Sequence, residues 1–349
     1  MLGHIEQNRP VVQRFGMHYS IDDVKSLPSS DWNIFSLPSP KHLQHIINSQ
    51  IDKITWATQI RKDASPSSAA RIVSQNQRGA FSALAAIPSQ QGLRISDPAL
   101  ILYVRTTLED PKLEQELAII AQNCGCGARA DNTQHSLNCI HNGAAHFRHN
   151  SCTMALNEAI ITYAGCATRF DSKLDARDWD DLQNIRPDLL VSGFALDGGD
   201  TAIEFATVNP SQSSLAPHAA LVPLYAARLR QQAKLAKYRD AMAASGTELL
   251  AATMEVTGAF GPQLNDIIAR ISSRFLSSGK DLDESVTWAA PSVGTLISQL
   301  LSVAMIRGNH TALMRLAGNK NRLARRLSGR LPLQHTFFIS IPPPNPLPL

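Results

Sequence analysis

The chain contains little cysteine, with five residues among 349. Small secreted domains held together by disulfides carry more cysteines in shorter chains and in even number, so the sequence argues against a disulfide scaffold. Long apolar runs are also missing, because the longest one, residues 293–306, is interrupted by Ser298, Gln299 and Ser302. This run is too short to span a bilayer, so we interpret it as a buried helix and expect no membrane partner.

Charge of one sign is not in large excess. The chain has 33 Lys and Arg against 29 Asp and Glu, and its net charge of +4 does not by itself indicate a nucleic-acid partner. The first residues show no basic stretch followed by an apolar one, so we expect no secretory signal and an intracellular protein. With 44% apolar and 18% charged residues, the composition is that of a globular protein of two or three domains.

Four regions follow one another along the chain. Residues 1–120 show helical spacing of apolar residues and no cluster of catalytic side chains, so we expect an accessory helical region there. Residues 121–150 are rich in Cys, His and Gly, and residues 151–317 combine β-like runs with helical ones. Residues 318–349 form a basic segment followed by a Pro-rich end, which we expect to be disordered.

The second region has a possible zinc-ligand set, Cys124, Cys126, His135 and Cys139. Three thiolates and one imidazole make the tetrahedral set that zinc favours, and Gly125 and Gly127 allow the backbone to turn tightly around an ion. Four protein ligands leave no open position, so such a zinc ion would be structural. Two alternatives stay open: one of three nearby histidines could be the fourth ligand, or the loop could hold reduced thiols and no metal.

The third region contains a predicted β-hairpin. Two β-like runs, residues 189–191 and 201–208, flank a turn of sequence Asp-Gly-Gly-Asp at residues 197–200, which is a strong hairpin signal. In such a hairpin Asp188 and Glu204 can lie side by side on neighbouring strands. Two carboxylates there form a hard oxygen site suited to Mg²⁺ or Mn²⁺, ions that activate water and stabilise charge on a phosphodiester. The alternative is a solvated hairpin with ordinary surface acids.

Other residues complete or compete with this pair. Asp200 is a rival second acid, although a residue at the tip of a turn points to solvent. The helix predicted beyond the hairpin supplies the cations Lys234 and Lys237. We expect helix from Pro210 to about residue 317, with Gly308 as a helix stop.

These parts occur in an order that is typical of one family. The chain resembles the C-terminal region of non-LTR retrotransposon polyproteins that use a restriction-like endonuclease. The similarity covers roughly residues 75–317. It is carried by the zinc-type ligands, Arg148-His149-Asn150, Arg186-Pro187-Asp188, the strand residues 203–210 (IEFATVNP) and the helical segment from Lys234 to Lys237-Tyr238.

This resemblance implies a PD-(D/E)xK nuclease fold, so we expect an α/β (α+β) chain with a restriction-endonuclease-like mixed sheet flanked by helices. It implies Mg²⁺-dependent nicking of DNA, with Asp188 and Glu204 as metal ligands and Lys234 or Lys237 as the cation that orients water or neutralises the transition state. Asp171 stands where relatives often place an upstream acid. DNA, or alternatively RNA, is the expected partner, and the nucleus is the expected location.

The chain also departs from the family pattern. Glu204 replaces the commoner Asp, and Ala206 stands where the wider superfamily usually has lysine, so the cation must come from the helix. No Ala/Tyr/Phe-x-Asp-Asp polymerase signature is present, so the chain resembles a truncated element or a remnant gene. Two other hypotheses remain: a catalytically inactive, zinc-containing nucleic-acid-binding protein that uses the basic segment 320–330, and a protein-interaction module in which zinc stabilises a loop.

Overall fold

The computed structural model describes residues 64–113, 115, 137, 143–170, 186–283, 287 and 289–328, without the side chains of 144 and 315–328. All of these residues belong to one compact unit, residues 64–349. Several predicted features lie outside the described residues: the helical spacing before residue 64, the acid Asp171, the basic side chains of 320–330, the Pro-rich end, and the zinc-type ligands Cys124, Cys126, His135 and Cys139.

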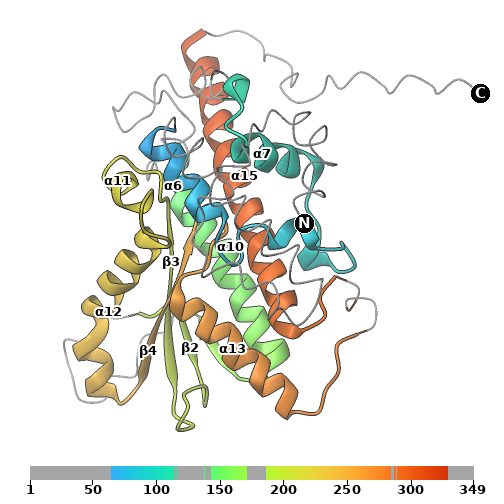
Figure 1. Ribbon diagram of the computed structural model, residues 1–349, viewed down its shortest axis with the longest axis vertical. Helices are drawn as coiled ribbons and strands as arrows, with labels where there is room; N and C mark the ends of the chain where they lie inside the picture. Colours follow the sequence, from blue (N-terminus) through green and yellow to red (C-terminus); the bar gives the residue numbers. More distant parts are fainter. Residues whose placement is uncertain are drawn as a thin grey trace, which may run out of the picture. The chain divides into compact units, whose positions relative to one another are not determined.

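A mixed four-stranded sheet forms the centre of this unit (Figure 1), with the strand order β1-β2-β3-β4. The strands are β1 (Thr168–Phe170), β2 (Leu189–Val191), β3 (Thr201–Val208) and β4 (Glu248–Glu255). β1 and β3 both pair antiparallel with β2, whereas β4 pairs parallel with β3. The first six residues of β3 are all buried, as is typical of a strand that has both faces covered.

Helices cover both faces of the sheet (Figure 1). After β3, the short helix α11 (Ala216–Ala219) and the long helix α12 (Tyr225–Ser245) lead to β4, and Tyr238 and Met242 of α12 pack on one face. The opposite face packs against α10 (Ala144–Ala159), α13 (Pro262–Ser277) and α15 (Val293–Ser328). The chain is therefore a mixed α/β protein with a helix-flanked mixed sheet, as predicted.

The described part of the N-terminal region is helical and packs on the same unit. It comprises α6 (Pro66–Gln75), the 3₁₀ turns η4 (Ser82–Ala85) and η5 (Gln91–Leu93), and α7 (Asp97–Thr107). α6 contacts α11, while η4, η5 and α7 contact α15. Ser65 caps α6 by accepting a hydrogen bond from the backbone N–H of Ser68 at 3.2 Å. Within the described residues, no helix is long and apolar enough to cross a membrane.

Three local predictions between residues 152 and 317 need correction. β1 was not expected, and the segment that forms β4 was predicted as helix because its sequence, ELLAATME, is rich in helix-favouring residues. The parallel pairing with β3 overrides that preference. Gly308 does not end a helix, since α15 continues through it to Ser328 and into the segment predicted as disordered. The buried helix predicted over residues 293–306 is confirmed as the first part of α15.

Candidate active site

The hairpin brings the two predicted acids together. Leu189 of β2 pairs with Ile203 of β3 in antiparallel register, so one further step places Asp188 opposite Glu204. The two carboxylates are close enough that the charge of Asp188 helps to raise the pKa of Glu204. The side-by-side arrangement that a hairpin makes possible for these two acids is therefore confirmed.

Glu204 is a buried carboxylate with one free oxygen. The residue is 1% exposed, and its Oε2 accepts a hydrogen bond from Nζ of Lys234 at 2.5 Å. Its Oε1 has no hydrogen-bond partner in the structure that is described. Burial raises the pKa of Glu204, the hydrogen bond from Lys234 lowers it, and the charge of Asp188 raises it again. A buried acceptor without a donor is costly, so this oxygen indicates a place where a cation or donor can be taken up.

Asp188 is held by two protein groups and stays accessible. Its Oδ1 lies 3.0 Å from Nε2 of His149 on α10, and its Oδ2 accepts a hydrogen bond from the backbone N–H of Phe205 at 2.7 Å. The His149 ring also meets the Phe205 ring edge to face, with centroids 6.2 Å apart. The Asp188 side chain is 22% exposed, so lone pairs on its oxygens remain open to a ligand.

His149 joins this site although the sequence does not assign it there. The only signal in the sequence is its place in the Arg148-His149-Asn150 step of the resemblance. The contact with Asp188 spans 39 residues and depends on how α10 packs against the sheet. Spacing along the chain therefore could not reveal it.

The structure separates the two predicted lysines. Lys234 contacts Glu204, whereas Nζ of Lys237 donates to the Tyr238 hydroxyl at 2.9 Å and lies 4.6 Å from the centroid of that ring. The hydrogen bond to Tyr238 is the main reason why the pKa of Lys237 is raised. Lys234 is therefore the cation at the carboxylate pair, and Lys237 lies beside it on the exposed side of α12.

Asp200 has a structural part in the hairpin turn. Its Oδ1 accepts a hydrogen bond from the backbone N–H of Gly193 at 3.1 Å, and its carbonyl accepts one from the N–H of Glu248 at 3.0 Å. These bonds hold the turn against β4. Asp200 is therefore not a second acid beside Asp188, and Glu204 occupies that position.

Arg148, next to His149, is buried, and two of its three guanidinium nitrogens lack a hydrogen-bond partner in the described part of the chain. It is 2% exposed, and its Nε and Nη1 form no hydrogen bond within the described residues. Burial lowers the pKa of its guanidinium to about 10. Its backbone lies against Gly308, where an added Cβ would come within 2.8 Å of the Arg148 Cα, so Gly308 allows α10 and α15 to approach closely.

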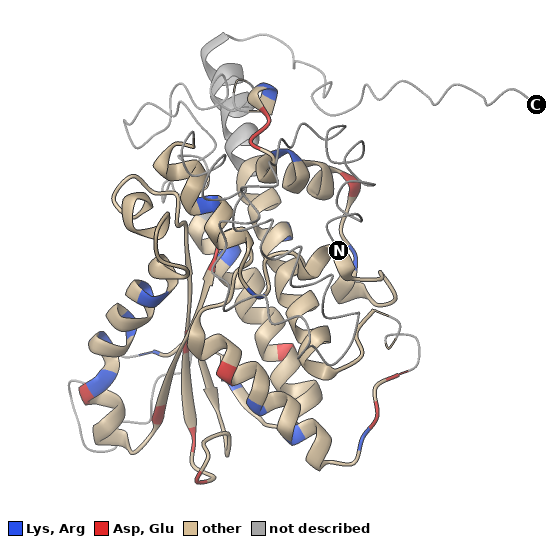
Figure 2. Ribbon diagram, viewed as in Figure 1, with Lys and Arg blue, Asp and Glu red and all other residues tan. Residues whose placement is uncertain are grey.

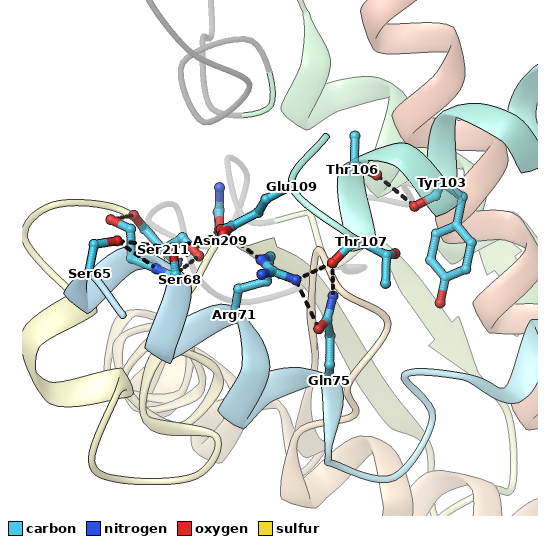
Figure 3. Close-up of polar contacts among 11 residues, drawn as sticks. Ser65, Ser68, Arg71, Gln75, Tyr103, Thr106, Thr107, Glu109, Asn209 and Ser211 are labelled. Atoms are coloured by element: carbon cyan, nitrogen blue, oxygen red, sulfur yellow. Dashed lines mark hydrogen bonds and ion pairs between the residues drawn. The ribbon is translucent and has the colours of Figure 1, made fainter. Parts of the chain in front are cut away.

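A cavity of about 50 Å³ lies apart from this site, bordered by α6, α7, α15 and the chain that follows β3 and β4. Two ion pairs border it, Arg71–Glu109 at 2.9 Å and Arg105–Asp110 at 2.5 Å. Arg71 also donates to the side chain of Gln75, and the network joins α6 to the end of α7 (Figure 3). The charged side chains around this cavity are already paired with one another, and its volume holds only about four waters. We therefore interpret it as part of the packing contact between α6 and α7 and not as a ligand site.

The carboxylate pair fits a magnesium or manganese ion better than it fits zinc. No group of three or more His, Cys, Asp or Glu side chains within the described ranges is arranged to hold a metal by itself. Mg²⁺, however, is commonly held by one or two carboxylates together with waters and substrate phosphates. Asp188 and Glu204 supply two such carboxylates, and the unpartnered Oε1 of Glu204 is an available hard ligand.

No model of a known protein family matches the chain, and no curated protein matches it either.

Proposed function

We propose that this chain is a Mg²⁺-dependent DNA endonuclease domain of the restriction-like, PD-(D/E)xK type, derived from a retrotransposon. One observation carries the proposal: Asp188, directly before β2, lies opposite Glu204 of the antiparallel strand β3, with Lys234 at hydrogen-bond distance from Glu204. Two acids and one lysine at one place on a helix-flanked mixed sheet are the parts that such hydrolysis needs. Mn²⁺ would be expected to replace Mg²⁺, because both prefer oxygen ligands.

Each side chain has a distinct task in this reaction. A bound divalent ion would supply the acidity that activates water and the positive charge that stabilises the phosphate. His149 and the Phe205 N–H fix the Asp188 carboxylate, so that its oxygens are presented in one orientation. The hydrogen bond from the Lys234 ammonium lowers the pKa of Glu204 against the larger effect of burial, and the ammonium would place a positive charge beside the phosphate as it gains negative charge.

A structural zinc site within residues 121–150 is the second part of the proposed function. We expect Cys124, Cys126, His135 and Cys139 to hold a structural zinc ion. Leu137, between the last two of these, is 8% exposed and packs with Leu102, Leu113 and Leu313. An apolar anchor at this point would hold a zinc loop against α7 and α15. A chromosomal DNA substrate would place the protein in the nucleus.

Nucleic-acid binding without cleavage is the second candidate. It is favoured by the fact that Lys234 and His149 already occupy one oxygen of each acid, and that Ala206 replaces the lysine usual in the superfamily. A remnant of a retrotransposon could keep such internal ion pairs and use only its basic surface.

Nicking of supercoiled plasmid separates the two candidates. The full chain should convert supercoiled to open-circular DNA with Mg²⁺ or Mn²⁺ and should fail with EDTA. Asp188→Ala should abolish nicking, while Asp200→Asn, which keeps the acceptor for Gly193, should retain it. Absence of nicking by folded wild-type protein would refute the enzyme and leave the binding protein, and equal loss in both variants would refute this site.

A further inference from the structure

Basic residues recur along α12, the helix that supplies Lys234 (Figure 2). Its sequence contains one acidic residue, Asp240, and five basic ones, Arg228, Arg230, Lys234, Lys237 and Arg239. Five basic residues on one helix are many for a chain whose total net charge is only +4. The helix that borders the carboxylate pair therefore carries an excess of positive charge that the net charge of the whole chain does not reveal.

Three of these residues form a row. Arg230, Lys234 and Lys237 stand at positions i, i+4 and i+7, which share one side of an α-helix. Lys234 reaches Glu204, so the row passes directly beside the candidate site. The charges of Glu204 and Arg230 both act on the ammonium of Lys237, the first raising and the second lowering its pKa, in agreement with this placement.

The two ends of the row are free to contact a ligand. Arg230 and Lys237 are both exposed, whereas Lys234 between them is largely covered. Arg230 makes no hydrogen bond or ion pair within the part of the chain that the structure describes, and Lys237 contacts only the neighbouring Tyr238. Two exposed cations therefore flank the half-buried lysine that contacts Glu204.

The length of the row suits a nucleic-acid strand. Seven residues of α-helix span about 10 Å, and one strand of duplex DNA carries a phosphate about every 3.4 Å along its axis. A row of this length can contact the phosphates on both sides of one that faces Lys234. An acidic peptide or a lipid surface would not need this row to be centred on two carboxylates and a lysine.

We propose that Arg230 and Lys237 hold the backbone phosphates of duplex DNA on either side of the phosphate that Asp188 and Glu204 receive. This inference rests on the proposed function, and it distinguishes the lysines: Lys234 serves the reaction, whereas Lys237 binds the substrate strand. Binding is then sensitive to salt, because each phosphate contact releases counterions from the DNA.

α12 itself offers a matched control. Arg228 and Arg239 are exposed cations on the same helix, but they lie roughly on the opposite side of it from the row, since two residues turn an α-helix by about 200°. Arg230→Gln/Lys237→Gln and Arg228→Gln/Arg239→Gln therefore remove the same charge from the same element. Only the first pair removes the row.

The test is fluorescence anisotropy of a labelled DNA duplex, titrated with full-length protein carrying Asp188→Ala and each pair of substitutions. Losing the row should weaken binding at least tenfold at low salt and reduce the slope of log K against log salt by about 2, as expected for two lost phosphate contacts. The control pair should change affinity less than threefold. Equal weakening by both pairs, no weakening by the row pair, or tighter binding of single-stranded RNA than of the duplex would overturn the inference.

Nicking by chains with intact Asp188 distinguishes this inference from the proposed function. Row variants should raise KM for DNA and leave kcat within about threefold, because they remove binding that is equal in the ground and transition states. If the wild type nicks but the row pair binds and nicks like the wild type, the endonuclease stands and the inference fails. If the wild type does not nick but binds through the row, the endonuclease fails and the inference stands.

Discussion

Glu204 shows how much of the site depends on single charges. Its carboxylate is buried beside Asp188, and both burial and that neighbour disfavour the ionised form. Lys234 opposes both effects through one hydrogen bond. An ion pair of this kind adds little net stability, but loss of one partner leaves an uncompensated buried charge.

Lys234→Met should therefore lower the free energy of unfolding by about 2–3 kcal/mol. This loss is smaller than the largest ones seen for broken buried ion pairs, because Glu204 can become neutral by taking up a proton. Urea denaturation at neutral pH measures the change. Lys237→Met, at an exposed position, should cost less than about 0.5 kcal/mol. Adding Glu204→Gln to Lys234→Met should restore part of the loss. If the Lys234→Met chain is as stable as the wild type, the hydrogen bond from Lys234 does not offset the cost of burying Glu204.

Cys152 allows a pH prediction at the same scale. It is fully buried in the main core, and burial raises the pKa of its thiol from 9.0 to about 12. Between these values the unfolded chain loses the proton and the folded chain keeps it. The free energy of unfolding is therefore unaffected by ionisation of this thiol below pH 9. It falls as the pH rises from 9 toward 12, by at most about 1.4 kcal/mol per pH unit.

Cys152→Ala should be less stable than the wild type at pH 8, because it leaves a small cavity, but its stability should fall less steeply above pH 9. The two curves of unfolding free energy against pH should therefore converge between pH 9 and pH 10. Chemical denaturation at half-unit steps of pH tests this. Parallel curves would mean that the thiol ionises as easily in the folded protein as in the unfolded one.

At the scale of elements, local sequence patterns predicted the hairpin but not the whole sheet. The bounds of β2 and β3 match the two apolar runs, and their antiparallel pairing agrees with the turn signal between them. The register does not follow from that turn, because a tight turn at residues 197–200 would place Asp188 opposite Asn209, whereas residues 192–200 together form the connection that brings it opposite Glu204. β4 was missed because its Ala- and Leu-rich sequence favours helix, and only the long-range pairing with β3 makes it a strand. His149 was missed as a partner of Asp188 for the same reason, since that contact also arises from packing.

The close contact of α10 with α15 offers a prediction about an element pair. Gly308→Ala removes a helix-disfavouring residue, which alone would gain about 1 kcal/mol. The new Cβ, however, would lie 2.8 Å from the Cα of Arg148, and backbone cannot yield as a side chain can. We expect a net loss of about 1–2 kcal/mol, measured by urea denaturation.

Gly294→Ala is the control for this change, because it also lies in α15 but its Cβ would meet the movable hydroxyl of Ser272 at 3.1 Å. It should be neutral or slightly stabilising. A Gly308→Ala chain as stable as the wild type would show that the two helices can separate without cost.

At the scale of the whole molecule, the candidate site draws on three structural elements. The hairpin provides Asp188 and Glu204, α12 provides Lys234, and α10 provides His149. α10 begins at Ala144, five residues after Cys139, and Leu137 is anchored between α7 and α15. A zinc ion bound by the predicted ligands would therefore fix the chain directly before the helix that holds Asp188.

Removal of zinc should consequently lower both thermal stability and nicking, because metal binding at a structural site contributes to folding free energy. The protein as purified should contain about one zinc ion per chain by atomic absorption, and Cys124→Ser should lose most of it. After chelation, excess Mg²⁺ should not restore the melting temperature, whereas zinc should. Cys152→Ala, which changes a buried core thiol, should keep its zinc and serves as the control. A wild-type chain that is folded and nicks DNA without zinc would show that residues 121–150 position α10 by packing alone.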